Sequence, residues 1–277
     1  MTFLERMAKA SRERVRAARA KESEAKLERR ALDAPAAPPL GLDRFDVIAE
    51  LKLRSPSAGG LARGDFDSRA QLAGYARGGA AAVSVLTEPT EFRGELEHLA
   101  AAAEALRPKR PVMRKDFLVD PYQVLEARAA GAGGVLVILA MLDDAAVRAL
   151  VDCARGLSMF VLLEAFDRAD LERLSAYDAP RAGGSPLLAG VNCRDLRDLE
   201  VRFERFAELG PYLPRHLPTV AESGIVNAGD VEAVVAAGFR LALVGSSLMR
   251  ASDPAAALAG LVAAGRAAVA GRQARCS

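Results

Sequence analysis

The stretch DVIAELKLRSPSAGG, residues 46–60, sets the terms for the fold. It begins as an apolar run, carries Glu50 and Lys52 two residues apart, and then breaks into Ser, Pro and Gly. Side chains two residues apart in a strand point to the same face, so both charges would lie on one side of a buried element. Burying charge costs free energy unless the charges are paired or used. The stretch therefore predicts a strand that ends in a polar pocket or in a structural ion pair.

Short apolar runs of this kind alternate along the chain with longer Ala, Leu, Glu and Arg segments of helical period. The expected strands span 46–52, 81–87, 111–115, 134–140, 159–165, 187–192, 218–223 and 241–246. The expected helices lie near 67–79, 94–106, 121–131, 143–155, 167–176, 202–209, 228–237 and 253–270. Such a succession of strand-helix units predicts an α/β fold, a closed (β/α)8 TIM barrel rather than an open sheet.

Residues 1–45 form an N-terminal helical extension followed by the Pro-rich connector DAPAAPPLGLD at 33–43, which cannot continue a helix. The barrel is expected over 46–277, with the chain forming a single domain overall. The excess of Lys and Arg in residues 1–30 could belong to a transit peptide or an RNA-binding arm. Acidic residues are interleaved throughout, however, which favours a solvated helix with i,i+4 pairs.

Composition limits the possible partners and compartments. With 51% apolar residues the chain can bury a large core, and its formal net charge of +2 is too small to attract nucleic acid or a membrane by field alone. No apolar run of membrane-spanning length and no signal-peptide core are apparent. We therefore expect a cytoplasmic protein with no nucleic-acid or membrane partner.

No metal or dinucleotide motif stands out. The three cysteines are isolated, and neither of the two histidines lies near a cysteine or a Gly-x-Ser-x-Gly turn. The glycine cluster GAGG at 131–134 closes an expected helix and precedes a strand, whereas a dinucleotide fingerprint follows a strand. We expect no metal, and we interpret the cluster as a helix C-cap.

Polar residues stand where the expected strands end, and barrel active sites lie at the carboxyl ends of strands. The set comprises Glu50, Lys52, Lys115, Glu164, Asn192, Arg194, Glu222, Ser223, Gly245 and Ser246. Any one of them could be structural, but their shared edge predicts a polar pocket. The small residues of ESGI (222–225) and VGSS (244–247) can surround an anion with backbone N–H groups, and SSLMR (246–250) can form a short helix pointing at a phosphate.

Six motifs carry a family resemblance: IAELKLRSPSAG (48–59), SVLTEPTEFRG (84–94), RKDFLVDPYQVLEARAAGA (114–132), GVNCRDL (190–196), AESGI (221–225) and LVGSSLMRASDP (243–254). Together they resemble indole-3-glycerol phosphate synthase of tryptophan biosynthesis. The resemblance implies closure of 1-(2-carboxyphenylamino)-1-deoxyribulose 5-phosphate to indole-3-glycerol phosphate, with loss of CO2 and water. It implies a lyase that needs no cofactor, because no redox step occurs.

The resemblance also implies roles for particular residues. The catalytic set would be Glu50, Lys52, Lys115, Glu164, Asn192 and Ser223. Phe92, Phe117, Leu136, Arg194, Leu196, Glu222 and Leu243 would bind the substrate, and Ser55, Gly224, Gly245 and Ser246 its phosphate. Which lysine serves ring closure and which dehydration stays open, and the five apolar residues could equally be core. Either lysine would need a pKa lowered toward neutrality by burial or by nearby cations.

Three departures from the family pattern stand out: Phe166 after Glu164, Arg54 one place later than the usual basic residue, and Cys193, expected to be a small packed residue. The alternative function is a phosphate-binding barrel that is non-catalytic, regulatory or of different specificity, such as phosphoribosylanthranilate isomerase. That isomerase would want a cysteine where this chain has Glu50 and Lys52. We expect a small-molecule substrate and a monomer or weak homodimer.

Overall fold

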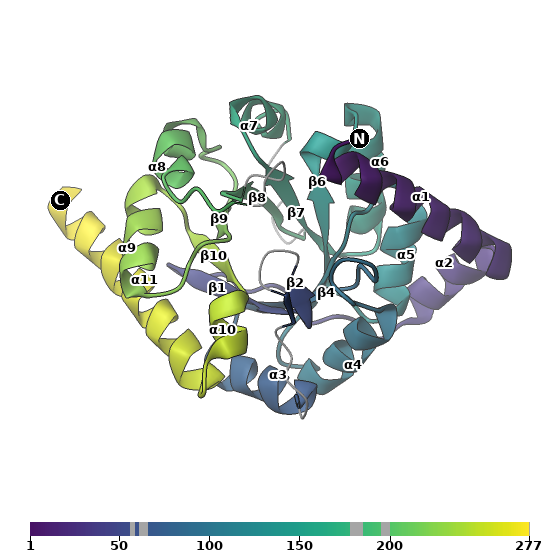
Figure 1. The fold of residues 1–277 in the computed structure, drawn as a ribbon, viewed down its shortest axis with the longest axis horizontal. Helices are drawn as coiled ribbons and strands as arrows, with labels where there is room; N and C mark the ends of the chain where they lie inside the picture. Colours follow the sequence, from purple (N-terminus) through teal and green to yellow (C-terminus); the bar gives the residue numbers. More distant parts are fainter. Residues whose placement is uncertain (56–58, 61–65, 178–184, 195–199, 277) are drawn as a thin grey trace.

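Eight parallel strands close into a barrel surrounded by helices in the computed structural model (Figure 1). The structure describes residues 1–277 except 56–58, 61–65, 178–184, 195–199 and 277, and not the side chains of 55, 275 and 276. The barrel order is β1-β10-β9-β8-β7-β6-β5-β4. These strands are β1 Asp46–Leu51, β4 Ala82–Leu86, β5 Val112–Lys115, β6 Gly134–Ile138, β7 Phe160–Ala165, β8 Leu187–Asn192, β9 Thr219–Glu222 and β10 Leu241–Val244. The predicted (β/α)8 barrel is confirmed.

The helices after β1 lie on the outside of the barrel and alternate with its strands, except that α10 and α11 both follow β10. They are α3 Ser68–Arg77, α4 Leu96–Leu106, α5 Pro121–Ala129, α6 Asp144–Gly156, α7 Arg168–Leu174, α8 Arg205–Leu209, α9 Ala228–Ala237, α10 Ser246–Arg250 and α11 Pro254–Cys276. Several begin at a side-chain cap: Asp67 caps α3, Asp143 caps α6 and Asn227 caps α9 in a capping box. The short helix expected over 246–250 is α10.

The two faces of each strand bury different side chains. In β1, Val47 and Ala49 belong to the layer between strands and helices, whereas Ile48 belongs to a separate cluster inside the barrel. The strand period of two then carries Glu50 and Lys52 to the inner side, at the end where the strand opens. Both expected charges therefore face the barrel interior. The β2–β3 hairpin, Arg54–Ser55 with Gly59–Gly60, was not predicted and lies beyond this end.

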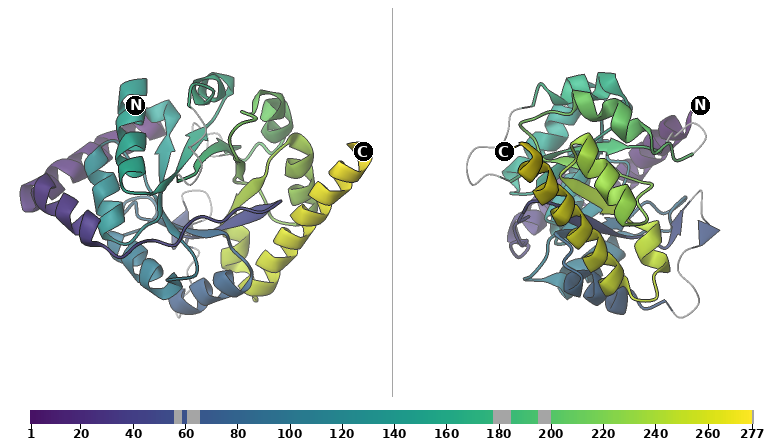
Figure 2. Two further views of the ribbon diagram at one scale, coloured as in Figure 1. Left: turned by 180° about the vertical axis from the view of Figure 1, so that it is seen from behind. Right: turned by 90° about the vertical axis from the view of Figure 1, so that its left-hand side faces the viewer.

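The N-terminal helices, α1 Phe3–Lys21 and α2 Glu24–Asp33, cover one side of the barrel. Buried residues recur along α1 at intervals of four: Phe3, Met7, Ser11 and Val15. Phe3 and Met7 pack in the same apolar cluster as the barrel interior. Figure 2 shows the N-terminus on the same side of the molecule as the β2–β3 hairpin. The expected solvated helix thus has one face committed to the barrel. The domain division at residue 46 stays a prediction.

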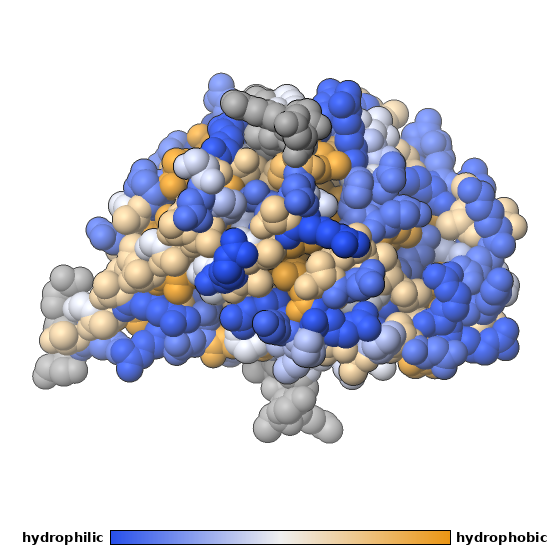
Figure 3. All heavy atoms as spheres, turned by 90° about the horizontal axis from the view of Figure 1, so that it is seen from below, coloured by the Kyte–Doolittle hydropathy of each residue, from blue (hydrophilic) through white to orange (hydrophobic). Residues whose placement is uncertain are grey.

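The last helix corrects one expectation about membranes. By length and composition, Pro254–Ala274 within α11 could cross a membrane, so the statement that no such run exists is wrong. The helix nevertheless takes the position of a barrel helix, packing on α9, α3 and β1. Gly265 lies against the Phe45 ring, where a Cβ would collide. Figure 3 views the molecule from below, with weakly apolar residues at the left, on the side of α11, among hydrophilic ones.

Candidate active site

A cavity of about 970 Å³ opens at the carboxyl ends of the barrel strands. Nearly every sequence-predicted site residue that the structure describes lines it: Glu50, Lys52, Phe92, Lys115, Phe117, Leu136, Glu164, Asn192, Arg194, Glu222, Ser223, Gly224, Leu243, Gly245 and Ser246. Leu196 lies outside the described residues, as does the side chain of Ser55. The alternation of charged residues and apolar runs at strand ends therefore marks one enclosed site.

Lys115 lies at the centre of the charged cluster. Its Nζ donates to Glu164 Oε2 at 3.2 Å and to Glu222 Oε2 at 3.1 Å, so one ammonium joins the ends of β5, β7 and β9. Burial acts to lower the pKa of Lys115, but the carboxylates of Glu222, Glu164 and Glu50 outweigh it and raise the pKa above its ordinary value. The expectation of a pKa drawn toward neutrality is therefore wrong for this lysine.

Glu50 on the inner face of β1 and Lys52 just after the strand form a second pair, with Lys52 Nζ 2.7 Å from Glu50 Oε1. Burial acts to raise the pKa of Glu50, but Lys52, Lys115 and Arg194 lower it below its ordinary value. Gly245 leaves room for this pair, because a Cβ there would lie 2.3 Å from Glu50 Oε1 and 3.0 Å from Lys52 Nζ. The Glu50 carboxylate is thus held ionised beside the loop after β10.

The pKa of Glu222 lies well above its ordinary value. Burial, opposed by Lys115 and reinforced by Glu164, raises its pKa to about 8. Its Oε1 has no hydrogen-bond partner among the described residues and lies over Gly190, where a Cβ would approach it to 2.2 Å. An orphaned carboxylate oxygen in a buried place disfavours ionisation. Glu222 is therefore inclined to hold a proton near neutral pH.

A polar chain links the ends of β7, β8 and β9. Asn192 Nδ2 donates to Glu164 Oε1 at 3.4 Å, and Ser223 Oγ donates to Asn192 Oδ1 at 2.8 Å. The Arg194 backbone N–H donates to the same Asn192 oxygen at 3.0 Å. Ser223 adopts a left-handed φ of 72°, a conformation that non-glycine residues take rarely. The contacts fix the Asn192 amide and orient Glu164.

One wall of the cavity is aromatic. The Phe117 ring lies 6.3 Å from Phe92 and 5.8 Å from Phe3, the latter edge-on. Phe117, Leu136 and Leu243 also belong to the cluster inside the barrel, so the two roles left open for them are compatible. Phe3 of α1 was not predicted as a site residue. Its signal was the stripe of apolar and small residues at intervals of four, which requires a surface to pack on.

The departures from the family pattern leave the charged cluster intact. Cys193 is fully buried, and burial raises its pKa to about 12, which agrees with a packed residue rather than a nucleophile. Phe166 packs at the edge of the interior cluster, where its backbone N–H donates to Asp170. Arg54 reaches the Thr90 carbonyl at 3.5 Å, which joins the loops after β1 and β4.

No group of three His, Cys, Asp or Glu residues in the described part of the chain is arranged to hold a metal ion. Two small-residue loops flank the cavity instead. Gly224 has a φ of 76°, in the region that favours glycine, and Gly245 and Ser246 begin α10. The first N–H groups of a helix lack partners within it, so these loops can present donors to an anion.

Fold and site together define a (β/α)8-barrel enzyme that acts on a small molecule at the carboxyl ends of its strands. The chain belongs to the indole-3-glycerol phosphate synthase family, whose profile matches residues 4–261. This is a family of carboxy-lyases of tryptophan biosynthesis.

Relatives agree with the family assignment, and solved structures agree with the barrel fold. An indole-3-glycerol phosphate synthase from Nocardioides sp. is 46% identical over 213 residues, 76% of this chain and 78% of that protein. One from Mycobacterium avium is 44% identical over 220 residues, 79% and 77% of the two chains. Among solved structures, 3-hexulose-6-phosphate synthase from Salmonella typhimurium has a TM-score of 0.60 at 15% identity, covering 80% of this chain and 98% of the other. That likeness concerns the fold alone.

Proposed function

We propose that the chain closes the indole ring of 1-(2-carboxyphenylamino)-1-deoxyribulose 5-phosphate, releasing CO2 and water, with the charged cluster as its acid-base machinery. The contact of Lys115 with both Glu164 and Glu222 carries the proposal. It places a charged donor between two carboxyl groups beside the aromatic wall. The anthranilate ring would lie against Phe117 and Phe92, which excludes water from the reacting atoms.

Ring closure needs a proton donor beside the ketone oxygen. The aromatic carbon that bears the carboxylate attacks the ketone carbon, and the oxygen takes a proton as the new bond forms. Lys115 at the end of β5 and Phe117 two residues later both line the cavity, so we assign this donation to Lys115. Its raised pKa keeps it charged, and it donates most readily to an oxygen that becomes alkoxide. Loss of CO2 then returns the electron pair to the ring and restores aromaticity.

Dehydration removes the hydroxyl formed from the ketone oxygen and one proton from the adjacent CH2. We assign the base to Glu164, whose Oε1 is oriented by Asn192. Lys52, which pairs with Glu50 at the end of β1, would protonate the departing hydroxyl from the other side of the barrel. A placed acid or base is typically worth about 10²- to 10⁴-fold in rate. Two separated ion pairs thus match two proton-transfer steps.

The substrate would lie across the cup with its phosphate at the small-residue loops. Gly224, Gly245 and Ser246 would supply backbone donors, with Ser55 from the loop after β1 and Lys52 adding charge. Arg194 would face the anthranilate carboxylate. Glu222 and Ser223 would contact the ribulose chain, where a protonated Glu222 can donate to a hydroxyl.

We propose that the chain works in the cytoplasm as a monomer or weak homodimer, without nucleic acid, membrane or cofactor. The formal charge of +2 supports the absence of a polyanionic partner.

The direct test uses product fluorescence. The chain has no Trp, so indole emission on mixing with the anthranilate-ribulose phosphate reports product alone. Lys115→Ala should abolish the signal with an unchanged circular dichroism spectrum. Lys109→Ala, an exposed lysine before the same strand, is the matched control and should keep full activity. Full activity in Lys115→Ala would remove the assignment, and no product from the unaltered chain would remove the proposed reaction.

A further inference from the structure

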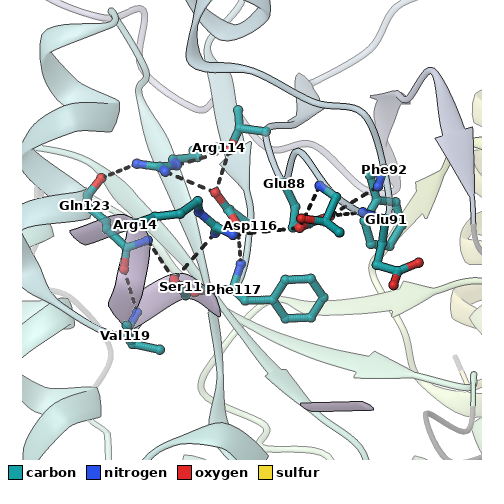
Figure 4. Close-up of polar contacts among 12 residues, drawn as sticks. Ser11, Arg14, Glu88, Glu91, Phe92, Arg114, Asp116, Phe117, Val119 and Gln123 are labelled. Atoms are coloured by element: carbon teal, nitrogen blue, oxygen red, sulfur yellow. Dashed lines mark hydrogen bonds and ion pairs between the residues drawn. The ribbon is translucent and has the colours of Figure 1, made fainter. Parts of the chain in front are cut away.

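The helix α1 reaches the cavity through charge as well as through Phe3. Arg14 donates from Nη2 to Asp116 Oδ1 at 2.6 Å, and its Nη1 lies 3.7 Å from Glu88 Oε1. Both carboxylates are fully buried at the side chain, whereas Arg14 retains 27% exposure. Figure 4 shows Arg14 directed at Asp116 in the middle of a polar network. One side chain of the extension thus contacts acids on two neighbouring barrel segments.

Asp116 fixes the turn that follows Lys115. Its Oδ1 accepts from the Phe117 backbone N–H at 2.8 Å, and its Oδ2 accepts from Arg114 at 3.0 Å and from Thr87 Oγ1 at 3.0 Å. The carbonyl of Phe117 in turn accepts from Ser11 Oγ at 2.5 Å, again from α1. The backbone of Phe117 is therefore held on both sides, by Asp116 and by the extension.

Glu88 plays the same part in the loop after β4. Its carboxylate accepts from three successive backbone N–H groups, those of Thr90 at 2.9 Å, Glu91 at 2.6 Å and Phe92 at 3.1 Å. Three such bonds fold the chain around the carboxylate and set the direction of Phe92 (Figure 4). Within the described residues, Arg14 is the one cation that the structure pairs with Glu88.

We propose that Arg14 is a positioning residue that sets the spacing of Phe92 and Phe117 in the aromatic wall, and so tunes affinity for the anthranilate end of the substrate. The inference rests on the proposed function. Each end of the guanidinium contacts one carboxylate, and each carboxylate accepts from the backbone N–H of one of the two phenylalanines. Removal of Arg14 leaves a buried Glu88 without its cation, so the loop that it organises is expected to loosen.

Arg19 provides a matched control on the same helix. It forms ion pairs of 2.9 Å with Glu24 and with Asp120, the N-cap of α5, and therefore also ties the extension to the barrel. Neither of its partners lines the cavity. A loss of docking strength alone would affect Arg14 and Arg19 variants alike, whereas a positioning role belongs to Arg14.

The test compares Arg14→Met and Arg19→Met, which keep an apolar stem and remove the charge. Arg14→Met should raise KM about tenfold with kcat within about threefold, because uniform binding is lost while the charged cluster is untouched. Arg19→Met should change KM less than about twofold. Amide hydrogen exchange at Phe92 and Phe117 should quicken in Arg14→Met alone. Arg14→Lys, which can reach one carboxylate but lacks the fork, should give an intermediate KM and is the second variant if Arg14→Met folds poorly.

Equal KM values in the Arg14 and Arg19 variants, with equal amide hydrogen exchange at Phe92 and Phe117, would overturn the inference and leave Arg14 a structural residue. An unaltered chain that forms no product would instead remove the proposed function. In that case the exchange measurement still tests the clamp, since faster exchange confined to Arg14→Met would support it and unchanged exchange would overturn it.

Discussion

Gly190→Ala tests whether the position of the Glu222 carboxyl group sets the activity of the site. Gly190 lies on the inner face of β8, and its Cβ would stand 2.2 Å from Glu222 Oε1 and 3.0 Å from Leu162 Cδ1. Ordinary contact requires a separation about 1 Å greater, so the buried carboxyl group has to move. Overpacking of this kind costs about 1–3 kcal/mol of stability. The movement also breaks the 3.1 Å contact with Lys115.

Kinetics and thermal unfolding of the same preparation measure the two effects. Glu222 holds Lys115, the proposed proton donor, and a misplacement of about 1 Å can cost about 10²-fold, so we expect kcat to fall by that factor. Gly271→Ala, where a Cβ meets nothing within 4 Å, is the matched control and should be neutral or slightly stabilising. The double variant Gly190→Ala/Glu222→Asp withdraws the carboxyl group and should unfold at a higher temperature than Gly190→Ala. Unchanged kcat and unfolding temperature in Gly190→Ala would refute this reasoning.

Two further predictions concern Glu222 and Phe3. The pKa of Glu222 in the folded chain is raised from 4.5 to about 8, so Glu222 contributes stability at low pH that is lost between about pH 4.5 and 8. The unfolding temperature of the unaltered chain should therefore fall across this range relative to that of Glu222→Gln. Parallel curves for the two chains would contradict the raised pKa. Phe3→Ala should raise KM and leave kcat nearly unchanged, because Phe3 packs on Phe117 and not on the charged cluster. A fall in kcat with an unchanged KM in the fluorescence assay would contradict this role for Phe3.

The sequence predicts the barrel well because each strand signals itself locally. Period-two burial, apolar composition and the side-chain caps of helices act over a few residues, and the observed bounds follow the predicted ones closely, as for 187–192 and 228–237. The charged cluster was predictable for a related reason. In a closed parallel barrel all strand ends meet at one edge, so Lys115 and Glu164 are neighbours once the topology is known.

Contacts between the extension and the barrel could not be read in the same way. The bond from Arg14 to Asp116 spans 102 residues of sequence, and an Arg among many in a charged helix carries no local sign of its partner. The pKa of Lys115 was likewise misjudged, since its direction depends on how many carboxylates converge on it rather than on its neighbours in sequence. Such pairings depend on the packing of α1 against the turn after β5.

The barrel also explains why the extension and the charged cluster belong together. Phe117 follows Lys115 by two residues, so the same turn that aims the lysine at Glu164 and Glu222 aims the ring at Phe92 and Phe3. Asp116 lies between them in sequence, and its buried carboxylate pairs with Arg14 and Arg114. A proton donor and an aromatic wall that share one turn move together, so changes in α1 should alter affinity before they alter chemistry. A change of KM in Arg14→Met and a change of kcat in Gly190→Ala would separate the effect on affinity from the effect on chemistry.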